Sequence, residues 1–155
     1  PLIPLYQQLC EELQLRYAEQ WPQIHDITSL VNRAIALTKD PELTPLAAMT
    51  LLGCTTAAEC LAGAVYASII HIANFDEAMI VSVNHSGRSG AVGAITGALL
   101  GARLGVEALP EFYLESLEAD DVLMELADDI CNARQIMNLF DDSWDMKYTQ
   151  GVPAH

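Results

Sequence analysis

The stretch that decides the fold reads VSVNHSGRSGAVGAITGALLGARLG and spans residues 81–105. Its second half repeats glycine at every fourth position, at Gly93, Gly97, Gly101 and Gly105. This spacing predicts an apolar helix over about 90–104 with the first three glycines on one stripe and Gly105 as its C-cap. Each glycine inside a helix costs about 1 kcal/mol relative to alanine. We therefore expect a central helix whose Gly93, Gly97 and Gly101 are buried against another helix.

Apolar residues recur at helical spacing along nearly the whole chain, which predicts an all-α fold without internal repeats. One stripe consists of Leu5, Leu9, Leu13 and Tyr17. Thr56 and Glu59 have capping-box spacing, and Asn74 or Asp76 is suited to start the next helix. Further helices are expected over about 27–35 with Asp26 as N-cap, and over about 46–52, 57–72, 75–83, 110–117 and 120–139.

Length and composition predict one helical domain over 1–140, followed by a polar, acidic tail over 141–155. The net charge of −14 argues against nucleic acid and against an anionic membrane surface as partners. The tail contains DDSWD at 141–145. This pattern matches the diphosphate-binding motif of isoprenoid synthases, but a solvated tail is the favoured interpretation.

Targeting signals are not evident in the sequence. The first residues lack the basic region of a secretory signal, and the weakly charged run over 90–102 is too short to span a bilayer. The four cysteines form no C-x-x-C pair or zinc-type spacing, so we expect buried free thiols and a cytoplasmic protein.

A polar loop precedes the glycine helix and carries one arginine. Such a loop delivers amides and side chains to a helix N-terminus, which favours anions. The candidate ligand-binding residues are Asn84, His85, Ser86, Gly87, Arg88, Ser89 and Gly90. An ordinary interhelical turn explains the pattern equally well, and His85 either contacts a ligand or orients the loop. For His25 and His71 we expect structural roles.

The stretch resembles the C-terminal signature of the ADP-ribosylglycohydrolase family. Residues 84–87 (NHSG) match the start of that signature. The matches that follow are Gly93, Ala94, Ile95, Gly97, Leu100, Gly101, Ala102, Gly105 and Pro110. The flanking segments NFDEAMIVSVNHS and LLGCTTAAECLAGAVYASI agree as well, so that the resemblance covers about 24–133. It implies a compact multi-helix bundle.

The family cleaves the glycosidic bond of ADP-ribosyl groups with a pair of magnesium ions, so the resemblance implies a magnesium site in this loop. The family's metal-binding positions are here Arg88, Gly90 and Ala91. Magnesium prefers oxygen ligands, usually including carboxylates, whereas arginine brings a fixed positive charge. We therefore expect no metal, no cofactor and no catalytic residue in this loop.

No segment of the chain matches the family's N-terminal acidic motif, which predicts a bundle lacking the family's N-terminal helices. We expect either a fragment or a shortened relative, with an exposed apolar face that a second copy or a partner chain covers. Three functions remain open. The chain is an inactive relative that still binds an ADP-ribose-like anion, a hydrolase whose metal ligands come from elsewhere, or an acidic interaction module without a ligand.

Overall fold

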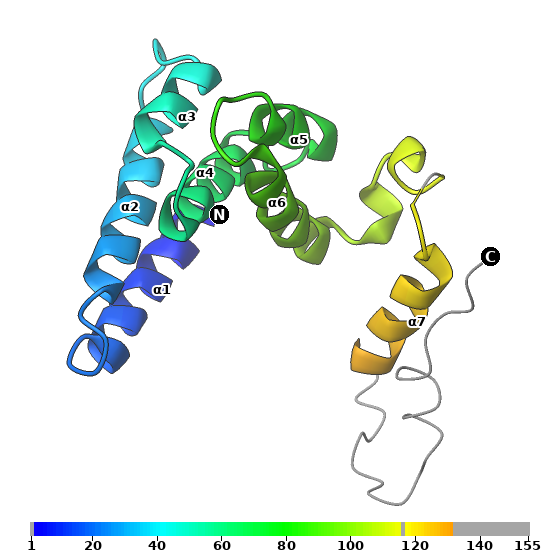
Figure 1. Cartoon of the computed structure of the whole chain (residues 1–155), viewed down its shortest axis with the longest axis horizontal. Coiled ribbons are helices and arrows are strands. Elements are labelled where there is room, and N and C mark those ends of the chain that lie inside the picture. Colours follow the sequence, from blue (N-terminus) through cyan, green and yellow to red (C-terminus); the bar gives the residue numbers. More distant parts are fainter. Residues whose placement is uncertain (1, 116, 132–155) are drawn as a thin grey trace, which may run out of the picture. The chain divides into compact units, whose positions relative to one another are not determined.

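The computed structural model describes residues 2–115 and 117–131, and the regular elements of this part of the chain are all helices, without a strand. This confirms the predicted all-α fold. The elements are α1 (Leu2–Tyr17), α2 (Ile24–Leu37), α3 (Pro45–Leu52), α4 (Ala57–Ile70), α5 (Phe75–Val83), α6 (Ser89–Leu104), η1 (Val106–Ala108), η2 (Glu111–Tyr113) and α7 (Asp120–Cys131) (Figure 1).

Contacts divide the chain into two compact units, Pro1–Glu111 and Phe112–His155. The first contains α1 to α6 and all the residues of the candidate site. The second contains α7, which has no buried residue within its described length. The predicted boundary between a domain over 1–140 and a tail lies outside the described residues and stays a prediction.

The helix at the centre of the first unit is α4, which contacts α2, α3, α5 and α6 (Figure 1). Its sequence AAECLAGAVYASII carries small residues on all sides, so neighbouring helices approach from every direction. The buried residues of α4 are Cys60, Ala62, Gly63, Ala64, Val65, Tyr66, Ala67 and Ser68. The expectation that the glycine helix occupies the centre was therefore wrong, because α6 packs mainly between α4 and α5.

The glycine stripe of α6 is tightly packed at one end only. Gly93 is buried, and a Cβ built there would lie 3.0 Å from Val83 Cγ1 on α5. At Gly97, which is half-buried, the nearest atom would be Met79 Sδ at 3.9 Å. A Cβ at Gly101 would meet nothing within 4 Å. Burial against another helix was thus predicted correctly for Gly93 and wrongly for Gly101.

Most helix ends are where local chemistry predicts them. Thr56 and Glu59 form the capping box of α4, and the Asn74 side chain accepts from the backbone of Glu77 to start α5. Gly105 ends α6 with φ +80°, in the region that favours glycine. His71 ends α4, and its Nδ1 lies 2.8 Å from Glu77 Oε2, which links α4 to α5.

Two predicted boundaries differ from the structure, and a third lies outside the described residues. Helix α2 begins at Ile24, so Asp26 lies in its first turn and is not the N-cap. The helix expected over 110–117 is reduced to η2. Helix α7 starts at Asp120 as predicted, but the predicted continuation to 139 lies outside the described residues.

The inner face of α1 differs from the stripe that the sequence indicates. Tyr6 and Cys10 are buried against α2 and α4, whereas Leu5 and Leu9 are 57% and 48% exposed. An apolar hollow of about 110 Å³ lies where α1 meets α2, α4 and α6, and Leu9 contributes to its lining whereas Leu5 does not. Its lining includes Leu9, Leu13, Ile27, Leu61 and Leu99. An apolar surface of α1 therefore has no covering element within the first unit. None of the described helices is both long and apolar enough to cross a membrane.

Candidate functional site

Two loops meet beside the N-termini of α4 and α6. The loop over 53–56 joins α3 to α4, and the loop over 84–88 joins α5 to α6. The backbone N–H of Arg88 donates a 2.7 Å hydrogen bond to the carbonyl oxygen of Cys54. A Cβ at Gly87 would lie 2.5 Å from that same oxygen and 2.8 Å from Cys54 Cβ. Glycine at position 87 is therefore required for the loops to come this close.

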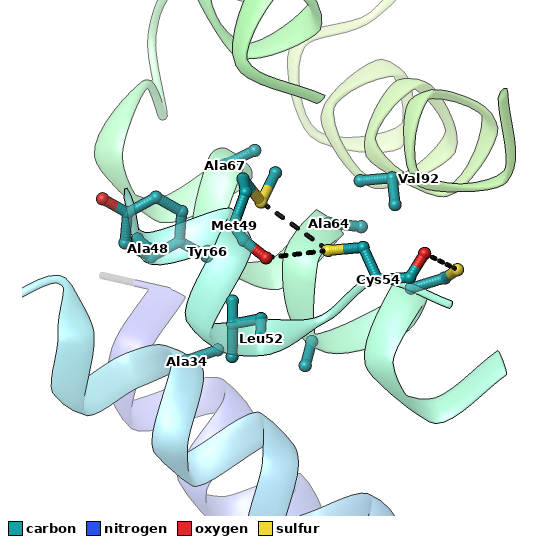
Figure 2. Packing of buried hydrophobic residues seen from close by; sticks show 11 residues of the cluster. Ala34, Ala48, Met49, Leu52, Cys54, Ala64, Tyr66, Ala67 and Val92 are labelled. Atoms are coloured by element: carbon teal, nitrogen blue, oxygen red, sulfur yellow. Dashed lines mark hydrogen bonds between the residues drawn. The ribbon is translucent and has the colours of Figure 1, made fainter. Parts of the chain in front are cut away.

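Cys54 is the residue on which the loop over 84–88 closes. Its φ of +53° is in the left-handed region, and its side chain is completely buried. Figure 2 shows its sulfur directed at Met49, 3.7 Å from the carbonyl oxygen and 3.9 Å from Sδ. On the other side, Gly63 of α4 comes so close that a Cβ there would lie 2.7 Å from Cys54 Sγ. The packing of Cys54 thus depends on two glycines, Gly63 and Gly87, that are far apart in sequence.

The Cys54 thiol is not a nucleophile in this arrangement. Burial, reinforced by the nearby Cys60 and Glu59, raises the pKa of the Cys54 thiol to about 11. A thiol with such a pKa is protonated at neutral pH and unreactive. Cys10 and Cys60 are buried too, as the sequence predicts, whereas Cys131 is exposed and that prediction was wrong.

Three of the predicted ligand-binding residues, Asn84, His85 and Gly87, make hydrogen bonds within the loop or from the loop to the end of α5. The Asn84 side-chain amide donates to the carbonyl oxygen of Ile80 at 2.7 Å. His85 Nε2 lies 2.9 Å from the carbonyl oxygen of Ser82, and Nδ1 accepts from the N–H of Gly87 at 3.0 Å. Of the two roles considered for His85, these contacts support orientation of the loop. Sequence reasoning had no signal for this bond pattern, because it depends on the path of the backbone through the turn.

The other four residues remain open to a ligand. Ser86, Arg88 and Gly90 are exposed, and Ser89 is half-buried. Of the first four amides of α6, those of Ser89, Ala91 and Val92 donate to carbonyl oxygens of Gly87 or Arg88, which leaves the amide of Gly90 as the remaining donor. The first turn of α6 contains no acidic residue. The ion pair between His71 and Glu77 does not involve Arg88.

The N-terminus of α4, in contrast, already holds an anion of its own. The Glu59 carboxylate accepts from the backbone N–H groups of Thr55 at 2.8 Å and Thr56 at 2.9 Å, and from the Thr55 hydroxyl. These bonds, the Thr55 hydroxyl first, lower the pKa of Glu59 to about 2. Of these two helix N-termini, only that of α6 has no carboxylate bound to it, and its Gly90 amide is available to an external anion.

The loop does not fit a magnesium ion. Arg88, Gly90 and Ala91 present a guanidinium group, a hydrogen and a methyl group, none of which is an oxygen ligand. Elsewhere in the part of the chain that the structure describes, no three His, Cys, Asp or Glu residues lie close enough together to hold a metal. The chemistry of this loop is that of an exposed cation beside a helix N-terminus.

Comparison with known proteins supports the resemblance noted in the sequence. The sequence model of one protein family, described as ADP-ribosylglycohydrolase, matches residues 5–139, most of the chain. The same comparisons found no match among curated proteins or solved structures.

Proposed function

Because this chain belongs to the ADP-ribosylglycohydrolase family, we propose that it is a member without hydrolytic activity that binds an ADP-ribose-like anion at residues 84–90. The observation that carries the proposal is Arg88. Its side chain is exposed at the N-terminus of α6, at a position where the family has a metal-binding aspartate. A fixed cation in this place attracts the phosphates of the ligand directly, without a bridging metal.

The donors around Arg88 suit a phosphate. A guanidinium group donates two parallel hydrogen bonds to a phosphate, and the hydroxyls of Ser86 and Ser89 and the amide of Gly90 supply further donors. Asn84, His85 and Gly87 keep the loop in place through the intramolecular contacts described above. Because Arg88 is exposed, binding is expected to be weak, independent of magnesium and reduced by salt.

Hydrolysis is not expected, since it requires a group that positions and activates water. In the family the metal ions supply this chemistry, and the loop has no ligands for them. The buried Cys54 thiol is protonated, and both ring nitrogens of His85 are engaged in the loop. No general base is thus available among the loop residues.

Calorimetric titration with ADP-ribose in the presence of a chelator tests the proposal. Arg88→Asp removes the cation and restores the family's acidic residue at this position, so it should weaken binding about tenfold or more. Arg103→Asp is the matched control. It makes the same change of charge in the last turn of the same helix, away from the loop, and should leave binding unchanged.

The outcomes separate the three functions considered for this chain. Magnesium-independent binding that Arg88→Asp abolishes and Arg103→Asp preserves supports the anion site. Binding only after magnesium is added contradicts it and indicates a hydrolase whose metal ligands lie elsewhere. Absence of binding by the native chain also contradicts it and indicates an interaction module.

A further inference from the structure

The hydrogen bonds of His85 require one particular form of its ring. The backbone N–H of Gly87 can only donate, so Nδ1, 3.0 Å away, must carry a lone pair. The carbonyl oxygen of Ser82 can only accept, so Nε2, 2.9 Å away, must carry the proton. Both contacts exist together only in the neutral imidazole with its proton on Nε2.

These two bonds connect the end of α5 to the contact between the two loops. Ser82 is completely buried, and its hydroxyl lies 2.6 Å from the carbonyl oxygen of Ala78 and 2.8 Å from the hydroxyl of Thr96 on α6. Gly87, at the other side of the ring, packs directly on Cys54. The half-buried ring of His85 thus joins a fixed point of the α5–α6 contact to the glycine that closes the loop.

We propose that His85 is a pH-sensitive latch, and that protonation of its Nδ1 releases Gly87 and loosens the loop over 84–88. A protonated ring carries hydrogen on both nitrogens, so Nδ1–H would face the N–H of Gly87, a donor against a donor. The latch concerns the conformation of the loop and does not require that the loop binds a ligand.

The direction of the pH effect follows from the form of the ring. Histidine is the side chain whose charge changes between about pH 5 and 8. Because the closed loop holds neutral His85, closing the loop competes with proton uptake. The latch is therefore intact where the ring is neutral and is lost where a fall in pH protonates it.

Few charged groups share the surroundings of His85. On the same loop lies Arg88, which opposes protonation of the ring, and on α4 lies Glu59, beside Gly53, which favours it. Cys54, which packs on Gly87, is a neutral thiol. The remaining charged groups of the two helices that the loop joins are at their far ends, Asp76 and Glu77 in the first turn of α5 and Arg103 in the last turn of α6.

Nuclear magnetic resonance of ¹⁵N-histidine-labelled protein tests the form of the ring. Over a pH titration, the neutral form of His85 should show the single tautomer with hydrogen on Nε2, and the form reached on acidification should carry hydrogen on both nitrogens. A proton on Nδ1 in the neutral form, or an exchanging mixture of both neutral tautomers, would overturn the proposal.

Amide hydrogen exchange tests the release of the loop. Corrected for the intrinsic effect of pH, the protection factor of Gly87 should fall about two- to tenfold as His85 becomes protonated, which is the effect of losing one hydrogen bond. Equal protection of Gly87 with neutral and with protonated His85 would contradict the latch. Neither measurement uses a ligand, so failure of the latch and failure of ADP-ribose binding are distinguishable.

A pair of variants isolates His85 from the other histidines. In His85→Asn the side-chain oxygen can replace Nδ1 as acceptor but cannot titrate, so Gly87 protection should become independent of pH. His25→Asn is the matched control, because His25 is exposed on α2, and it should keep the pH dependence of the native chain. If His85→Asn retained that dependence, the latch would be wrong; if it did not fold, the two measurements on the native chain would decide.

Discussion

At residue scale, Gly87 and Gly97 differ in what a methyl group would meet. At Gly87 the methyl would lie 2.5 Å from the backbone oxygen of Cys54, which is fixed by its hydrogen bond from Arg88. At Gly97 the nearest atom is the flexible side chain of Met79, at an ordinary contact distance of 3.9 Å. Of these two glycines, only Gly87 therefore occupies a position that requires glycine for reasons of space.

This difference predicts opposite effects of the same substitution. Gly87→Ala should destabilise the fold by about 1–3 kcal/mol, because backbone atoms must shift to admit the methyl group. Gly97→Ala should stabilise it by about 0.5–1 kcal/mol, since alanine has less backbone freedom to lose in a helix. Urea unfolding of the two variants measures both free energies. Changes of the same sign in the free energy of unfolding would contradict the close contact between Gly87 and Cys54.

At the scale of a helix, the start of α4 shows how a capping residue ties stability to pH. The Glu59 carboxylate bonds Thr55 and Thr56, which lowers its pKa from 4.5 to about 2. A group whose pKa is lower in the folded state stabilises the fold fully above its unfolded pKa. This contribution is lost as the pH falls from about 4.5 towards 2.

Comparison of the native chain with Glu59→Gln checks this contribution. The variant should be less stable at neutral pH, and the difference should shrink as the pH falls through the window from about 4.5 to about 2. Glu42→Gln, at an exposed position before α3, serves as control and should match the native chain over the same range. A stability difference for Glu59→Gln that does not change with pH would contradict the assignment of the carboxylate to the cap.

At the scale of the whole molecule, the apolar face of α1 that no other element of the first unit covers predicts association. We propose that a second copy or a partner chain covers the surface formed by Leu5 and Leu9, next to the apolar hollow that Leu13 helps to line. Burial of such a surface is the main favourable term in association. The net charge of −14 opposes contact between two copies, so salt should strengthen self-association.

Sedimentation velocity over a range of concentrations measures this association. The native chain should form a concentration-dependent oligomer, and the double variant Leu5→Gln with Leu9→Gln should remain monomeric. Leu15→Gln, at a position of α1 that is 88% exposed and outside the hollow, should behave as the native chain. A native chain that is monomeric at all concentrations, without any partner, would rule out self-association.

The sequence by itself determined the helices, most of their ends and the family. Helical period and caps depend on residues within four positions of each other, as with Thr56 and Glu59, so they can be read without knowing the fold. The seven candidate ligand-binding residues over 84–90 are likewise contiguous in the sequence. The helix expected over 110–117 was one exception, and α1 was another, because apolar residues on two of its faces left the choice of the buried face to its neighbours.

The tertiary structure alone decided what the residues of the stretch over 81–105 contact and which of them are exposed. Cys54 is separated from Gly87 by more than thirty positions, and their contact distinguishes a required glycine from the replaceable ones at Gly97 and Gly101. In the turn after α5, His85 accepts a hydrogen bond from the N–H of Gly87, whereas Arg88 stays exposed. Packing between distant segments leaves no periodic pattern in the sequence. The helical spacing of small residues therefore does not show which of them a distant segment will contact.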